Sequence, residues 1–198
     1  MKNDNEIFII YTDYHVLYCI LCKADSSKKR GIVTNRLAKG QKPRKTAMIE
    51  TGLLLITYGM AVFQYASLFL ERYLLPLKLP ASLRWLGIVL AFIGVLFFIL
   101  AITTMRDSWR AGIDESQKTA MVTRGIYSIS RNPAFVGFDL LYIGSALAMP
   151  GVLIFVLALA GVLFIHLQIL EEEVYLPRIF GDEYAEYQKR TPRYFLFF

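Results

Sequence analysis

The fold is decided by a 38-residue apolar stretch, PAFVGFDLLYIGSALAMPGVLIFVLALAGVLFIHLQIL, which occupies residues 133–170. Its one charged side chain belongs to Asp139. A helix needs about 20 apolar residues to cross a bilayer, so this stretch is long enough for two crossings. Pro150 and Gly151 interrupt it near the middle and favour a turn over a continuous helix. The stretch therefore predicts a hairpin of two transmembrane helices, 133–149 and 151–170.

Two other stretches that are nearly free of charge, 47–70 and 81–105, are each long enough to cross a membrane. Residues 7–22 form a shorter candidate that contains Asp13. Hydrophobic residues make up 56% of the chain, and the mean hydropathy is +0.44. These values exclude a disordered chain and argue against a soluble domain. We expect one all-α integral-membrane domain, residues 1–198, built as a bundle of about five transmembrane helices.

Lysine and arginine are distributed unevenly between the two sides of the membrane that this topology defines. Of the 22 basic residues, 18 fall in segments 23–45 and 106–131 and in the tail after residue 170, and 4 fall on the other side. Basic residues are enriched in cytoplasmic loops, so we expect an external N-terminus and a cytosolic C-terminus. The net charge of +6 is then a topology signal that also contacts anionic membrane lipids. No accompanying recognition pattern indicates a nucleic-acid partner.

The two cysteines, Cys19 and Cys22, form a CxxC pair, a spacing that occurs in metal and redox sites. No second pair accompanies them, and they end an apolar segment, in which cysteines pack as small hydrophobic residues. The chain also lacks the glycine-rich GxGxxG and GxxxxGKS/T nucleotide-binding motifs. We therefore expect no metal centre and no soluble Rossmann-type cofactor site.

Polar residues concentrate in two segments that the topology places on the cytosolic side. One is the connector between the third and fourth crossings, residues 106–135, and the other is the tail, residues 171–198. Because the fourth and fifth crossings form a tight hairpin, we expect connector and tail to meet over one cavity. Within the tail, Gly181 and Asp182 predict a chain break followed by a short amphipathic helix that ends before Pro192.

Three consecutive glutamates, Glu171, Glu172 and Glu173, follow the predicted fifth crossing. At about 100° per residue they cover roughly 200° of the helix surface, so at least one must face the bundle or the tail. A carboxylate there, near Tyr127 and the tail tyrosines, would suit a cationic ligand through charge and cation–π attraction. Alternatively, the glutamates form a solvated helix end that faces Arg178. The pattern alone leaves both interpretations open.

The start of the fourth crossing carries two further signals. Asn132 followed by Pro133 predicts a helix start, because asparagine is a good N-cap and proline is favoured at the first helical position. Asp139 lies deep in the predicted helix, where an acid is a candidate functional residue, although a hydrogen bond to Tyr142 would also satisfy it. Small residues on single helix faces predict close helix packing: Gly87, Ala91, Gly137 and Gly144.

Taken in order, these segments resemble the isoprenylcysteine carboxyl methyltransferase and phospholipid methyltransferase group of integral-membrane enzymes. The resemblance rests on Ser108-Trp109-Arg110, Gly125-Ile126-Tyr127, Arg131-Asn132-Pro133-Ala134-Phe135, the Glu-Glu pair and Phe180-Gly181-Asp182-Glu183-Tyr184. It covers about the C-terminal half of the chain. It implies a multi-span bundle that binds S-adenosylmethionine on its cytosolic side, between the connector, the start of the penultimate crossing and the tail.

Carried over position by position, the resemblance assigns a set of cofactor contacts. These are Gly112, Thr119, Ala120, Met121, Val122, Tyr127, Asn132, Pro133, Ala134, Phe135 and Glu173, with Glu172 assisting. Two positions depart from the family pattern. The family commonly has histidine where this chain has Asn132, and the prenylcysteine enzymes have an arginine, associated with substrate, where this chain has Gln168. We therefore expect an acceptor other than a prenylcysteine carboxylate.

Methyl transfer from a sulfonium is an in-line displacement that mainly requires alignment and desolvation of the two reactants. An anionic carboxylate or thiolate acceptor needs no base, whereas a neutral amine needs one, and His166 or Asp139 are the candidates. Together with Gln168 they are expected to face an apolar or lipidic acceptor. Two alternatives are a non-catalytic membrane scaffold of the same fold and an NADPH-dependent enzyme like the sterol reductases, whose C-terminal regions look similar.

Overall fold

The computed structural model describes residues 25, 37–40, 42–70, 76–108 and 120–195. These residues form five α-helices and two short 3₁₀ turns. The helices are α2 (Arg44–Leu70), α3 (Ala81–Met105), α4 (Pro133–Ala148), α5 (Val152–Phe180) and α6 (Asp182–Arg190), and the turns are η2 (Arg106–Ser108) and η3 (Gly125–Ser128). Within these ranges the extended pairing is limited to one isolated bridge, between Pro76 and Gly151. The predicted all-α fold is confirmed, and the predicted crossing at 7–22 lies outside the described residues.

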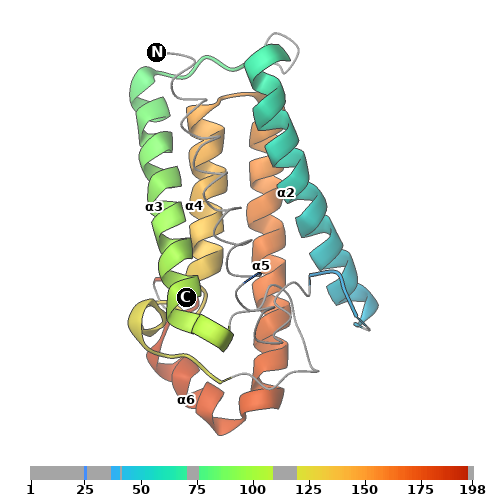
Figure 1. Ribbon diagram of the computed structural model, residues 1–198, viewed down its shortest axis with the longest axis vertical. Helices are drawn as coiled ribbons and strands as arrows, with labels where there is room; N and C mark the ends of the chain where they lie inside the picture. The colour runs from blue at the N-terminus through green and yellow to red at the C-terminus, as the bar shows by residue number, and fades with distance from the viewer. Residues whose placement is uncertain (1–24, 26–36, 41, 71–75, 109–119, 196–198) are drawn as a thin grey trace.

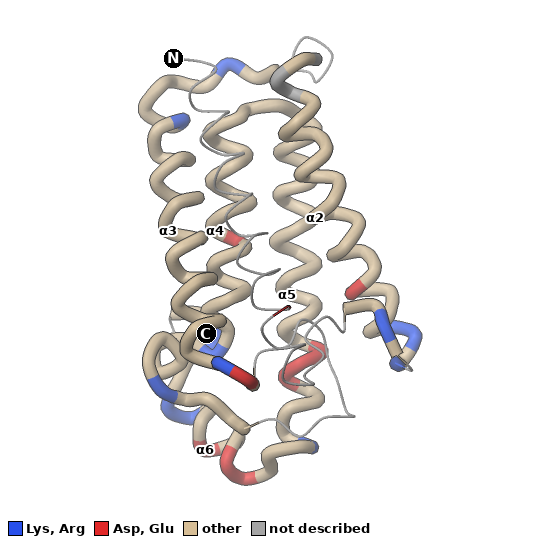
Figure 2. Tube along the Cα trace, in the orientation of Figure 1, with Lys and Arg blue, Asp and Glu red and all other residues tan. Residues whose placement is uncertain are grey.

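The four long helices stand side by side and alternate in direction, and α6 lies across their lower end (Figure 1). Three of them are long and apolar enough to cross a membrane: Arg44–Ala66, Ala81–Ser108 and Val152–Phe180. The fourth, α4, is apolar but has 16 residues and rises about 24 Å at 1.5 Å per residue. Charged residues gather at the end of the bundle where α6 lies, and few occur along the helices (Figure 2).

The hairpin predicted from the apolar stretch is present. Helix α4 begins at Pro133 with Asn132 in the N-cap position, and Gly151 precedes α5. At the turn, the backbone N–H of Leu77 donates to the carbonyl of Pro150 at 2.9 Å. The chain that enters α3 is thereby tied to the hairpin turn at the end of the bundle opposite to α6 (Figure 1).

Helices α3 and α4 meet along a seam of small residues, as their spacing predicts. A Cβ atom added to Gly94 would lie 2.5 Å from the carbonyl oxygen of Gly137, and one added to Gly144 would lie 2.5 Å from the backbone nitrogen of Ala91. The two backbones are therefore close enough that no side chain fits between them. Beside the seam, a buried core of large apolar side chains fills the bundle: Phe98, Ile102, Leu141, Ile165 and Ile169.

Helix α5 extends ten residues beyond Leu170, where the apolar stretch ends, and reaches Phe180. The three glutamates thus lie inside a continuous helix rather than at its end. Gly181 separates α5 from α6 with a backbone φ of 54°, a left-handed conformation that glycine adopts without strain. The break lets α6 turn back beneath the bundle (Figure 1).

Candidate functional site

A group of ion pairs, which we call the Glu173 cluster (Glu173, Arg131 and Arg193), joins connector, helix and tail below the bundle. The Nη2 of Arg131 donates to one carboxylate oxygen of Glu173 at 2.6 Å, and the Nη2 and Nε of Arg193 donate to the other at 2.6 and 3.0 Å. The side chains of Glu173 and Arg131 retain 9% and 10% of their exposed surface. Such largely buried, charge-assisted contacts are strong and directional.

The chain after α6, Thr191–Phe195, which we call the C-terminal segment, folds back against the connector. The Nη1 of Arg131 donates to the carbonyls of Thr191 at 2.7 Å and Gln188 at 3.3 Å, and the N–H of Arg131 donates to the carbonyl of Pro192 at 2.9 Å. The Nδ2 of Asn132 donates to the carbonyl of Arg193 at 3.1 Å. Asn132 thus holds the position of an N-cap, but its side chain makes no capping hydrogen bond and holds the C-terminal segment.

The two tyrosines of α6 fix this helix to the connector. Tyr184 and Tyr187 are both buried, and the hydroxyl of Tyr187 donates to the carbonyl of Tyr127 at 2.6 Å. Burial, and then the negative charge of Glu173, raise the pKa of Tyr184 to about 12. Burial is also the main reason why the pKa of Tyr127 lies above its ordinary value. These tyrosines therefore stay neutral at physiological pH and act through packing and hydrogen bonding.

The three glutamates have three different sets of partners, whereas the sequence predicted only that at least one of them faces the bundle or the tail. Glu171 accepts from Thr46 at 2.6 Å and pairs with Lys45 at 2.6 Å, both at the start of α2. Glu172 accepts from the Nε2 of Gln168 at 3.1 Å, and Glu173 belongs to the cluster described above. The interpretation as a solvated end facing Arg178 therefore does not apply to Glu173. The acidic part of α5 joins α2, the connector and the tail.

The candidate acceptor residues lie higher in the bundle. The Nδ1 of His166 and the hydroxyl oxygen of Tyr194 are 2.7 Å apart and hydrogen-bonded, and their rings stack at an interplanar angle of 19°. The charge of Asp139 acts on Tyr194, since after burial it is the next cause that raises the pKa of that tyrosine. The hydroxyl of Tyr142 is 2.7 Å from Thr57, and the Oδ1 of Asp139 is buried without a hydrogen-bond partner.

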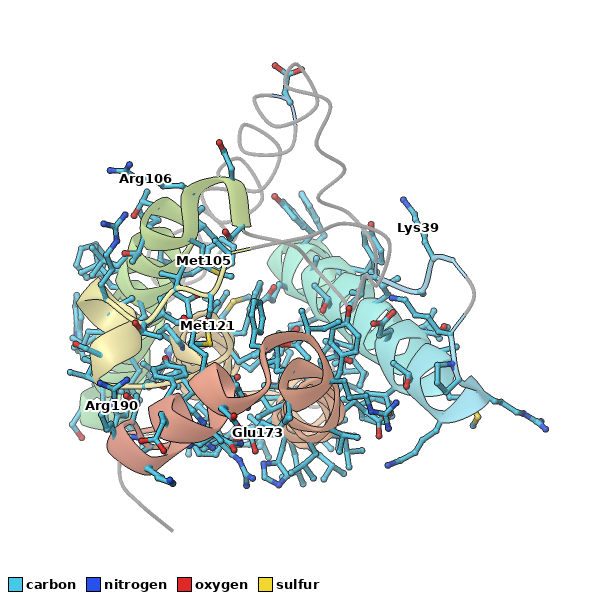
Figure 3. All side chains as sticks on the ribbon, turned by 90° about the horizontal axis from the view of Figure 1, so that it is seen from below. Lys39, Met105, Arg106, Met121, Glu173 and Arg190 are labelled. Atoms are coloured by element: carbon cyan, nitrogen blue, oxygen red, sulfur yellow. The ribbon has the colours of Figure 1, made fainter. Side chains whose placement is uncertain are left out.

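The remaining predicted contact residues are distributed as follows. Gly112 and Thr119 lie outside the described residues, and Ala120 is exposed. Met121 and Val122 are partly buried, and Met121 lies between Met105 and Glu173 in the view from below (Figure 3). Pro133 is buried at the start of α4, while Ala134 and Phe135 pack against the hydrophobic core. The structure therefore brings Asn132 and Glu173 together, since both contact Arg193 of the C-terminal segment. Tyr127 is connected to them through α6, because its carbonyl accepts the hydroxyl of Tyr187.

Sequence reasoning missed Arg131, Arg193 and Tyr194 as members of this site. Arg131 was visible inside the motif that starts the fourth crossing, but nothing in the pattern marks it as the partner of a glutamate 42 residues away. A second missed feature is Glu50, which is completely buried in α2 and forms a salt bridge with Lys42 at 2.6 Å. Among the described residues, no group of three or more metal-binding side chains is found.

Comparison with known families decides the relationship. The model of the family described as phospholipid methyltransferase matches residues 82–183, slightly more than half of the chain. The chain belongs to the phospholipid methyltransferase family. The matched residues cover nearly all of α3, the connector, α4, α5 and the start of α6, and they contain Arg131 and Glu173 but not the C-terminal segment.

Three curated relatives illustrate what the chain is similar to. A protein-S-isoprenylcysteine O-methyltransferase of Xenopus laevis is 29% identical over 136 residues, which are 67% of this chain and 47% of that protein. A protein of the same name from Schizosaccharomyces pombe is 38% identical over 74 residues, which are 36% of this chain and 31% of that protein. Another from Homo sapiens is 35% identical over 80 residues, which are 40% of this chain and 28% of that protein. The chain thus spans about half the length, or less, of the relatives it matches here.

Proposed function

We propose that this protein is a membrane methyltransferase that uses S-adenosylmethionine and acts on an apolar or lipidic acceptor at the cytosolic face of the bilayer. The observation that carries the proposal is the convergence of the connector, the acidic part of α5 and the C-terminal segment at the Glu173 cluster. Family membership supports methyl transfer as the reaction. The three long apolar helices support a site embedded at the membrane boundary.

The polar groups at this end of the bundle fit the chemistry of S-adenosylmethionine. Three buried polar atoms in the described residues have no hydrogen-bond partner: the Nε of Arg131, the Oδ1 of Asp139 and the Oε1 of Gln168. Buried polar groups are normally paired, so unpaired ones are candidates for ligand contact. The guanidinium of Arg131 suits the carboxylate in the amino-acid moiety of S-adenosylmethionine. The side-chain oxygens of Gln168 and Glu172 suit the ammonium group or the ribose hydroxyls of the same molecule.

Glu173 has a more limited capacity for direct contact than its position in the sequence indicates. Its carboxylate already accepts three hydrogen bonds from Arg131 and Arg193. An ionised carboxylate has about four lone-pair sites, so one further contact fits without breaking the cluster. We propose that Glu173 contributes that single contact and fixes both arginines. Tyr127 and Asn132 would shape the surrounding wall. The other residues that the resemblance assigns to it are Gly112, Thr119, Ala120, Met121, Val122, Pro133, Ala134 and Phe135.

The bound donor supplies an electrophilic methyl group, and the side chains of this chain have three tasks. They bind and orient both reactants, they exclude water, and they accept a proton where the acceptor is neutral. Alignment in a dry site can contribute roughly 7 to 11 kcal/mol to lowering the barrier, and no covalent enzyme intermediate is needed. His166, which is hydrogen-bonded to Tyr194, and Asp139 would take part in proton transfer, and the buried Gln168 would face the acceptor.

We propose an acceptor other than a prenylcysteine carboxylate, although the relatives are named for that chemistry. Gln168 is completely buried and offers a neutral amide at the place where an arginine would bind a carboxylate. The two arginines of the Glu173 cluster, Arg131 and Arg193, already pair with Glu173. A buried carboxylate without a countercharge is costly, so a neutral amine or a thiol suits this place better.

The test is to incubate the purified protein with lipid extracts and isotopically labelled S-adenosylmethionine, and to identify labelled products by mass spectrometry. A labelled lipid would establish the reaction class and the acceptor together. A protein that never binds the donor would contradict the proposal and favour a non-catalytic scaffold. A preference for NADPH over S-adenosylmethionine would indicate the reductase alternative.

Glu173→Gln is expected to weaken S-adenosylmethionine binding about tenfold or more from a micromolar starting affinity. The change removes the charge that holds Arg131 and Arg193, and one charged hydrogen bond contributes roughly 1.5 kcal/mol or more, about a factor of ten. Isothermal titration in detergent measures the affinity. Glu186→Gln is the matched control, because Glu186 pairs with Lys189 on the exposed side of α6. Equal affinities in the two variants would remove Glu173 from the site.

We propose that the end of the bundle with α6 faces the cytosol and that the N-terminus lies outside. A variant without Cys19 and Cys22 provides the background for single cysteines at Asp182 and Lys78, both exposed and near opposite ends. In right-side-out membrane vesicles, an impermeant maleimide should label the cysteine that replaces Lys78 and spare the one that replaces Asp182. Labelling of the latter alone would reverse the orientation.

A further inference from the structure

The C-terminal segment connects the two halves of the proposed site through consecutive residues. Arg193 donates to Glu173, and the next residue, Tyr194, is hydrogen-bonded to His166 at 2.7 Å. The following residue, Phe195, packs edge-on against Phe97 of α3 with ring centroids 5.4 Å apart. Three successive side chains therefore reach three different contacts, and the middle one touches a residue expected to face the acceptor.

Tyr194 is held in place by its surroundings. Its ring stacks on the imidazole of His166 and packs against the hydrophobic core. The backbone before it is fixed by the hydrogen bonds from Arg131 to Pro192 and from Asn132 to the carbonyl of Arg193. A hydroxyl positioned by both packing and backbone contacts can set the orientation of its partner, because little freedom remains to be lost.

We propose that Tyr194 is a positioning residue that accepts the Nδ1–H of His166 and thereby leaves the lone pair of Nε2 directed at the acceptor. This inference rests on the proposed methyl transfer and extends it by assigning the tautomer of the base. The neutral imidazole carries one proton, and the hydrogen bond made by one ring nitrogen decides the role of the other.

In this arrangement His166 is the donor of the hydrogen bond. The Nδ1 of His166 and the hydroxyl oxygen of Tyr194 are 2.7 Å apart, and the tautomer of the ring decides which of them donates. Asp139 has a buried Oδ1 without a hydrogen-bond partner, and in its ionised form it favours a Tyr194 hydroxyl proton that points away from His166. The Nδ1–H then becomes the donor, and Asp139 supports the base through Tyr194.

With a neutral amine or thiol acceptor, the proton balance is simple. The acceptor atom forms a bond to the methyl carbon as the bond between that carbon and the sulfonium sulfur breaks, and the electron pair of the broken bond stays on sulfur. The proton of the acceptor atom moves to the Nε2 of His166, and the ring becomes an imidazolium whose Nδ1–H remains bonded to Tyr194. Orientation of the base by a third group is the arrangement by which positioned imidazoles work in proton transfer.

Tyr194→Phe in the full chain tests this inference, because it removes the hydroxyl and keeps the ring. The sequence contains two histidines, so the His15→Gln background leaves His166 as the single histidine signal. We expect ¹⁵N NMR of histidine-labelled protein in micelles to show the Nδ1–H tautomer, and Tyr194→Phe to shift it toward Nε2–H. This measurement needs neither donor nor acceptor.

Activity gives the second readout. Tyr194→Phe should lower kcat about tenfold while KM changes less than about twofold. General-base assistance accelerates a reaction by a factor of roughly 10² to 10⁴, and loss of the Tyr194 hydroxyl removes only part of that acceleration. Tyr58→Phe is the matched control, since this exposed tyrosine of α2 points away from the core. Donor affinity and the thermal midpoint of Tyr194→Phe should equal those of the parent protein, which establishes that the variant is folded.

The outcomes separate the two proposals. An Nε2–H tautomer in the parent protein, or a tautomer unchanged by Tyr194→Phe, would overturn the positioning role even if the protein methylates lipids. A change in KM or stability alone would also overturn it and assign Tyr194 to packing. A predicted tautomer shift in a protein that turns over no acceptor would support the positioning of His166 and refute methyl transfer.

Discussion

Arg131→Met is expected to lower the free energy of unfolding by about 3 to 5 kcal/mol, the cost of breaking a buried ion pair by removing one partner. The change leaves Glu173, whose side chain is 9% exposed, with Arg193 as its remaining partner in the cluster. It also removes the donor to the carbonyls of Thr191 and Gln188. We expect the C-terminal segment to detach and donor binding to be lost. Thermal unfolding in micelles and donor titration measure the two effects.

Arg190→Met is the matched control for Arg131→Met. Arg190 is the last residue of α6, directly before Thr191, and its Nε donates at the surface to the carbonyl of Glu186. A change within about 0.5 kcal/mol is expected for such an exposed site. Replacing Arg131 and Glu173 together with methionine should recover part of the lost stability, because no unpaired buried charge remains. If Arg131→Met were as stable as Arg190→Met, the Glu173 cluster would not hold the tail.

The double variant Gly94→Ala with Gly144→Ala is expected to lower the stability by about 2 to 6 kcal/mol, the sum of two overpacked sites. At each position the new Cβ would lie 2.5 Å from backbone atoms of the opposite helix, the carbonyl oxygen of Gly137 and the nitrogen of Ala91. Backbone cannot rotate away as a side chain does, so α3 and α4 must separate. We expect a large loss of the folded fraction in micelles, measured by thermal unfolding and by protease resistance.

Gly59→Ala is the matched control for the seam. It introduces the same methyl group into a transmembrane helix, but the nearest atom to the new Cβ is Leu157 Cδ2 at 3.7 Å, an ordinary van der Waals distance. Alanine also has a higher helix propensity than glycine, so the variant should be as stable as the parent or slightly more stable. Equal destabilisation by all three substitutions would show that the effect does not depend on the close approach of α3 and α4.

The local features of the fold followed from short-range chemistry. Pro133 begins α4 because proline fits the first helical position, and Pro150 with Gly151 places the hairpin turn. Gly181 separates α5 from α6. The continuation of α5 to Phe180 was not predicted, because its three glutamates interrupt the apolar pattern. They are compatible with a long helix because Lys45, Thr46 and the arginines of the cluster bind them.

The candidate site was predictable in part. Its location at the charged end, on the connector and the acidic part of α5, followed from topology and from the resemblance of the C-terminal half. The partners of its acids did not follow. Arg131 and Glu173 are 42 residues apart, and His166 and Tyr194 are 28 apart. No periodicity links such pairs, since a pattern reports which face of a helix a residue occupies and not which other segment meets it.

The sequence by itself determined the helical class, the apolar lengths, the hairpin and the end of the molecule at which polar chemistry gathers. Each of these depends on the composition or spacing of neighbouring residues, which a linear chain displays directly. The tertiary structure alone decided that the last residues fold back, that Glu173 is held by two arginines, and that Tyr194 is hydrogen-bonded to His166. Those contacts arise because the packed helices bring distant segments together. Charged groups and hydroxyls that become buried there are stabilised only when they pair with one another.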